Sequence, residues 1–94
     1  MVITVLEARI EASMYDQLQK AYREHTGMVP DSIVQSYLIQ DQSDQNRWQI
    51  LTIWRSVKDL VTMRASGETP TGVLIFNTVG AKPELSISDI RQTT

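Results

Sequence analysis

The stretch RWQILTIWRSVKDLVTMRASGETPTG, from Arg47 to Gly72, decides the fold because it joins a strand pattern to a helix pattern. Residues 47–55 are rich in β-branched and aromatic side chains, which is typical of a strand. The following SVKD is a capping box, in which Ser56 caps a helix and Asp59 reaches back to it. The stretch therefore predicts a strand followed directly by a helix, which ends at the glycine of RASG.

Two further strand patterns precede this stretch. Residues 2–10 and 32–40 alternate as strands do, and the polar turn DQSDQN joins the second of them to residues 47–55 as an antiparallel hairpin. A helix lies between the two strands, with Ser13 as its N-cap and Gly27 as its terminating glycine.

The C-terminal part adds two more elements. Thr69 as a cap and Pro70 at the first helical position predict a short helix that ends at Gly80, although Gly72 and several β-branched residues inside it weaken the pattern. Residues 83–90 alternate as a last strand.

This order predicts an α+β, ferredoxin-like β-α-β-β-α-β sandwich: a four-stranded antiparallel sheet with helices on one face, in a single domain over residues 1–94. The core of so short a chain is thin. The uncovered sheet face would mix apolar with polar side chains and be too apolar to face water, so we expect a homodimer through this face. Arg9 and Arg55 are expected to form ion pairs with Glu7 at that interface.

Composition excludes several functions. The chain has no cysteine, which rules out disulfides, thiolate chemistry and cysteine-ligated metal clusters, and fits a cytoplasmic location. The net charge is −2 and the basic residues are scattered, so nucleic acid is not an expected partner. No apolar run approaches the roughly 20 residues of a membrane span, and the N-terminus lacks the basic start of a signal peptide.

The segment ILTIWRSVKDLVTMRAS resembles the antibiotic biosynthesis monooxygenase domains of the dimeric α+β barrel superfamily. The resemblance rests on a third strand that ends in Trp54, on Ser56 two residues later, and on the acidic and apolar helix start. It implies a dimeric barrel with a cavity between sheet and helices in each protomer. Some members oxidise aromatic polyketides or quinols with molecular oxygen and neither metal nor flavin, and others degrade haem.

The residues favour the first of these activities. Haem-degrading members use an Asn on the first strand, a Trp at the end of the third and a His on the following helix. Only Trp54 has a counterpart here, because the first strand has no Asn and the helix reads VTMRAS around Met63. Without an imidazole this site lacks the family's axial iron ligand, so we expect no cofactor and no metal.

The two tryptophans are candidate substrate-binding residues. Trp48 and Trp54 are separated by an even number of positions, so they share one strand face with Ile50 and Thr52. The resemblance places this face toward the cavity. They form either a stacking wall for a flat ligand or ordinary core packing.

Three other residues complete the candidate site. His25 is the only histidine and hence the only imidazole base, although a cation at a helix end is also explained by the helix dipole. Tyr37 and Gln35 could orient a substrate hydroxyl or carbonyl, although Tyr37 is better explained as a cross-strand packing residue.

Two functions remain open. One is a cofactor-independent monooxygenase that acts on a small aromatic quinol or polyketide. The other is a non-catalytic dimeric module that binds a small apolar ligand or has a structural role. A ferredoxin-like electron-transfer role is excluded, because no cysteine is present to hold a cluster.

Overall fold

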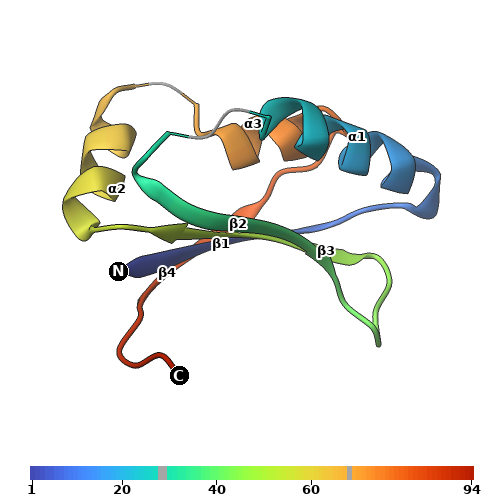
Figure 1. Ribbon diagram of the computed structural model, residues 1–94. Helices are drawn as coiled ribbons and strands as arrows, with labels where there is room; N and C mark the ends of the chain where they lie inside the picture. Colours follow the sequence, from blue (N-terminus) through green and yellow to red (C-terminus); the bar gives the residue numbers. More distant parts are fainter. Residues whose placement is uncertain (28–29, 68) are drawn as a thin grey trace.

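The computed structural model describes residues 1–27, 30–67 and 69–94. Its elements follow the predicted order, with one short 3-10 helix added before the first α-helix (Figure 1). The strands are β1 (Val2–Arg9), β2 (Ile33–Gln40), β3 (Arg47–Trp54) and β4 (Glu84–Asp89), and the helices are η1 (Ala12–Met14), α1 (Tyr15–His25), α2 (Val57–Ala65) and α3 (Thr71–Asn77).

The four strands form one antiparallel sheet in the order β2-β3-β1-β4, so β1 and β3 are its central strands. Helices α1, α2 and α3 lie on one side of the sheet and leave the other side open (Figure 1). This arrangement confirms the predicted ferredoxin-like α+β fold. No helix in the described part of the chain combines the length and apolar character needed to cross a membrane.

The main core lies between the sheet and the helices α1 and α3. Leu18 of α1 and Phe76 of α3 are completely buried, and Leu6 and Ile50 from the central strands pack in the same cluster. These strand residues have even numbers, as the period of two requires for one face of β1 and β3. A second, smaller cluster forms beneath α2 at the far end of the sheet.

The helix ends agree with the sequence for α2 and differ for α1. Ser56 caps α2, since its hydroxyl accepts the backbone N–H of Asp59 at 3.2 Å. The prediction that Ser13 caps the first helix is wrong, because this residue lies inside η1 and α1 begins only at Tyr15. Gly27 does not have the left-handed backbone of a terminating glycine, whereas Gly67 and Gly80 do, at φ 78° and 74°.

Strand β2 contains a bulge that determines which of its side chains face the helices. Ile33 lies opposite Trp54, whereas Gln35 lies opposite Ile53, so Val34 is an extra residue in the pairing. An extra residue inverts the alternation. Gln35 and every second residue after it therefore point to the open side of the sheet.

Apolar side chains occupy the centre of this open face. They are Ile3, Val5, Tyr37, Ile39, Leu51 and Ile53. The chain exposes 6529 Å² in total, whereas a compact monomer of 10.7 kDa exposes about 5,500 Å². The open face and the C-terminal residues, which leave the sheet on the same side (Figure 1), contribute to this excess.

Ion pairs at the edge of the open face form within the chain. Glu7 pairs with Arg47 at 2.7 Å, and Arg9 pairs with Asp44 at 2.6 Å. The hydrogen bond from Arg9 lowers the pKa of Asp44. Within the chain, Glu7 is thus paired with Arg47 and not with Arg9 or Arg55. Arg55 instead donates to a backbone carbonyl in the segment that precedes β2.

Candidate functional site

A cavity of about 330 Å³ lies between α2, the start of α3 and the helix side of the sheet. This volume is at the lower end of the range of small-molecule sites. The sheet contributes Thr4, Leu6, Thr52 and Trp54, and α2 contributes Leu60, Met63 and Arg64. Residues 69–73, which lead into α3, line the opposite side. The lining is therefore mostly apolar, with several hydroxyl groups and one cation.

Trp54 forms an aromatic wall of this cavity. Its side chain packs against Val2 and Leu60, with only 6% of its surface exposed. The indole N–H donates to the Thr4 hydroxyl at 3.0 Å, which fixes the ring and satisfies its single donor. Both residues line the cavity, so a bound molecule would meet a ring held in one orientation.

Trp48 has a different environment, although it shares the strand face with Trp54. It is 5% exposed and belongs to the main core, where its ring centroid lies 5.2 Å from that of Tyr15. It lines neither the main cavity nor a smaller neighbouring one. Of the two tryptophans predicted to bind substrate, only Trp54 thus lines one of these cavities. Trp48 and Trp54 are six residues apart on β3, which corresponds to about 20 Å along the strand. Trp48 therefore lies beneath α1, whereas Trp54 lies beneath α2.

Tyr37 and Gln35 lie on the other face of the sheet. The bulge at Val34 turns both toward the open side, and Tyr37 is 49% exposed there. The expectation that they face the cavity with Trp54 is wrong. Strand alternation alone does not reveal an extra residue, so the sequence could not show this inversion.

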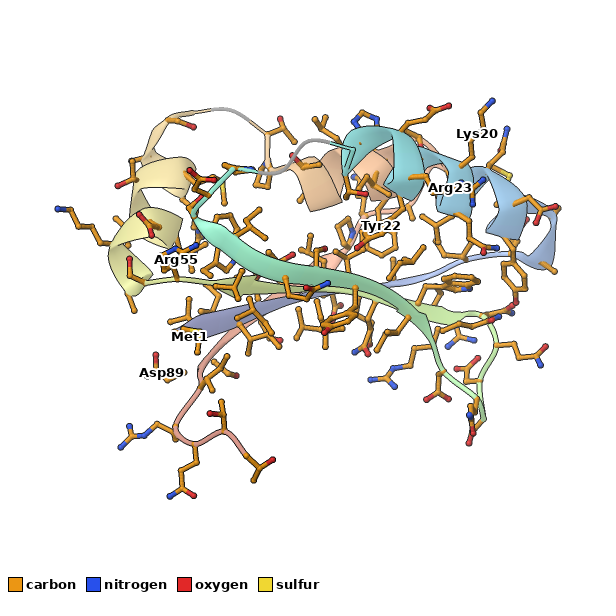
Figure 2. All side chains as sticks on the ribbon, viewed as in Figure 1. Met1, Lys20, Tyr22, Arg23, Arg55 and Asp89 are labelled. Atoms are coloured by element: carbon orange, nitrogen blue, oxygen red, sulfur yellow. The ribbon has the colours of Figure 1, made fainter. Side chains whose placement is uncertain are left out.

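A smaller cavity of about 50 Å³ adjoins the main one beneath the C-terminal end of α1. Tyr22, His25 and Thr26 line it, and Tyr22 points from α1 toward the sheet (Figure 2), where its hydroxyl donates to the Ser36 hydroxyl at 3.0 Å. Both cavities are lined by Pro30, Ile33, Thr52, Thr71 and Gly72. His25 is thus next to the main cavity but does not line it.

Sequence reasoning missed most of the lining of the main cavity, including Thr4, Met63, Arg64 and Gly72. Thr4 and Arg64 carry no local motif, and only their tertiary position brings them to Trp54. Gly72 did leave a signal, since a glycine inside a short helix is unfavourable unless something requires it. A Cβ at this position would lie 2.5 Å from Cδ1 of Leu6, so the glycine lets α3 approach β1 closely.

Replacing Gly72 by alanine is expected to lower the free energy of unfolding by about 1 kcal/mol. The buried side chain of Leu6 would have to shift, and overpacking costs about 1–3 kcal/mol. Alanine recovers about 1 kcal/mol of helix propensity, which offsets only part of that cost. Urea unfolding measures the difference, and a variant more stable than the native chain would contradict the close contact between α3 and β1.

Metal ligands do not gather in the described part of the chain, where no three His, Cys, Asp or Glu side chains could hold one ion. Within the described lining of the main cavity, Arg64 is also the only side chain that carries a charge at neutral pH. A general base for a ligand in this cavity must therefore come from a residue outside the described lining.

Sequence comparison finds no family model that matches the chain and no similar curated protein. Structural comparison does find similar folds. A crystal structure of an antibiotic biosynthesis monooxygenase has a TM-score of 0.71 at 13% identity, with 98% of this chain and 100% of that chain covered. SnoaB, a cofactor-independent oxygenase from Streptomyces nogalater, has a TM-score of 0.73 at 12% identity, over 98% of this chain and 94% of its own.

A third similar structure has a different ligand. MhuD, crystallised with two manganese protoporphyrin IX molecules bound per active site, has a TM-score of 0.73 at 15% identity, over 100% of this chain and 98% of its own. SnoaB is a cofactor-independent oxygenase, whereas MhuD binds manganese protoporphyrin IX on the same fold, so the fold does not decide the reaction. The chain therefore has the same fold as antibiotic biosynthesis monooxygenase domains, which is the fold that the segment around Trp54 predicted.

Proposed function

We propose that the main cavity binds a small, flat, largely apolar organic molecule and that the protein oxidises it with O₂ without a cofactor. The observation that carries this proposal is Trp54, whose fixed indole walls a cavity of about 330 Å³. A flat aromatic molecule can pack against such a ring while the aliphatic side chains around it exclude water. The similarity of fold to a cofactor-independent oxygenase supports this reaction.

The chemistry requires a substrate that can itself reduce O₂, such as an anthrone. A base removes one proton from the ring methylene, and the resulting carbanion carbon forms a bond to O₂ to give a peroxide. Loss of the second methylene proton then breaks the O–O bond, which leaves a carbonyl and releases water. The substrate supplies all four electrons, so the protein has to orient it, accept a proton and exclude water.

His25 is the proposed proton acceptor and would act through the smaller cavity. That cavity, at about 50 Å³, has room for a few water molecules, since each needs roughly 10–15 Å³ of such space. The hydroxyls of Tyr22 and Ser36 lie beside it and offer hydrogen bonds to such waters. A proton could thus pass from a substrate in the main cavity to the imidazole through one water.

Oxygen uptake by the purified protein with anthrone tests this four-electron reaction. Uptake with menadiol, which would give menadione and H₂O₂ in a two-electron oxidation, tests a quinol as the alternative substrate. We expect uptake faster than spontaneous autoxidation for at least one of them, and a fall of about 100-fold in kcat for His25→Gln. Arg23→Gln is the matched control, because Arg23 lies on the same helix, is exposed to solvent and lines neither cavity. Full activity in His25→Gln would exclude His25 as the acceptor.

A non-catalytic binding module is the second candidate. It is favoured by the described lining of the main cavity, which offers no imidazole or carboxylate in direct reach of a ligand. Saturable ligand binding combined with uptake no faster than autoxidation would establish this function in place of the first.

We further propose that the open sheet face pairs with the same face of a second copy, which gives a dimeric barrel. The chain exposes roughly 1,000 Å² more than a compact monomer of its mass. A typical stable interface buries about 800 Å² on each partner. Because the face consists of an apolar centre with ion pairs at its edge, it can contact a copy of itself across a two-fold axis.

A further inference from the structure

Arg64 is the charged group of the main cavity. It stands in the last turn of α2, is exposed to solvent and lines the cavity beside Met63. The other described lining residues are apolar or carry neutral polar groups. Among the described lining residues, a ligand in this cavity would therefore contact one positive charge and no negative charge.

The Arg64 guanidinium is also unpaired within the described residues. The cations that do form ion pairs there are Arg9, Lys20 and Arg47, and Arg55 donates to a backbone carbonyl. A cation at the end of a helix complements the helix dipole wherever its side chain points. That role accounts for a basic residue at this position, but it does not account for a side chain that lines a largely apolar cavity.

We propose that the cavity selects planar ligands that carry one ionised oxygen, with the aromatic ring against Trp54 and the anionic oxygen at Arg64. This inference rests on the proposed function, which places an aromatic ligand against Trp54, and it adds that the ligand carries a negative charge. A guanidinium presents several N–H donors in a plane, which suits an enolate, phenolate or carboxylate oxygen. Because Arg64 is exposed to solvent, water screens this contact in part, so the expected preference for an anion is modest.

The preference for an anion has a consequence for the reaction. The anionic form of the substrate is the one that transfers electrons to O₂, so a cation that favours this form also makes loss of the proton easier. Arg64 would then act as a specificity-determining residue in binding. The expected signature is a loss of affinity for anions, without any loss for neutral molecules of the same shape.

A matched pair of naphthoquinones tests the inference. Menadione is neutral, and lawsone has an ionised oxygen at neutral pH where menadione has a ring methyl. We expect the native protein to bind lawsone about three- to tenfold more tightly than menadione, as measured by quenching of tryptophan fluorescence. In Arg64→Gln the two affinities should become equal, with that for menadione unchanged.

Lys58→Gln is the matched control, because it removes one positive charge from the same helix at a position that does not line the cavity. It should keep the preference for lawsone, and a loss of the preference in this variant as well would overturn a specific role for Arg64. Equal binding of both quinones by the native protein would also overturn the inference but leave the proposed binding site intact. Binding of neither quinone would overturn the proposed function and the inference together.

Discussion

Truncation of Trp54 to alanine is expected to lower the free energy of unfolding by about 3 to 5 kcal/mol and to weaken menadione binding by at least about tenfold. Trp54 is 6% exposed and holds together a small cluster with Val2 and Leu60, so its removal leaves a large void beneath α2. The loss of an aromatic contact of this size corresponds to about 1.4 kcal/mol or more of binding. Urea unfolding and equilibrium dialysis measure the two effects separately.

Thr4→Val is the companion change for Trp54. It keeps the volume of the side chain but removes the acceptor of the indole N–H, which would then be buried without a partner. The expected cost is about 1–3 kcal/mol of stability, with a smaller loss of menadione affinity than in Trp54→Ala. If Trp54→Ala unfolds at the same urea concentration as the native chain, the cluster beneath α2 does not stabilise the fold as described.

Replacing Leu51 by lysine is expected to convert a dimer into monomers. Leu51 lies on the open face of the central strand β3, opposite Val5 and Tyr37. On a monomer, a substitution at such a partly exposed position changes stability by about 0.5 kcal/mol or less. In the proposed dimer, two-fold symmetry would bring two lysines into one apolar interface, which costs several kcal/mol. Light scattering gives the mass, expected to fall from twice 10.7 kDa to that value.

Val61→Lys is the control for this change. Val61 is 58% exposed on α2, on the helix side of the sheet, so a charge there should leave the mass unchanged. A native protein that is already monomeric, or a Leu51→Lys variant that stays dimeric, would contradict pairing through the open face.

The sequence predicted the fold well because its signals are local. The strand at Arg47–Trp54 alternates cleanly, Ser56 marks the helix start, and the glycine at position 67 ends the helix as expected. Each of these features depends on a few neighbouring residues, and together they define the element order. Element order in turn leaves few possible topologies for a sheet with short connections.

The candidate site was only partly predictable, because it depends on contacts between distant segments. The sequence identified Trp54 but could not separate it from Trp48, since both have the same strand face and differ only in which helix lies above them. The bulge at Val34 reversed the expected side of Tyr37. Arg64 belongs to the site only because the end of α2 lies beside the loop that leads into α3.

The difference between the two tryptophans provides the most direct test of the proposed binding site. Trp48→Phe leaves Trp54 as the single emitting indole, and Trp54→Phe leaves Trp48. Titration of both variants with menadione should give saturable quenching in Trp48→Phe and only weak, unsaturable quenching in Trp54→Phe. Saturable quenching of Trp48 in the Trp54→Phe variant, or no saturable quenching in either variant, would contradict a ligand site walled by Trp54.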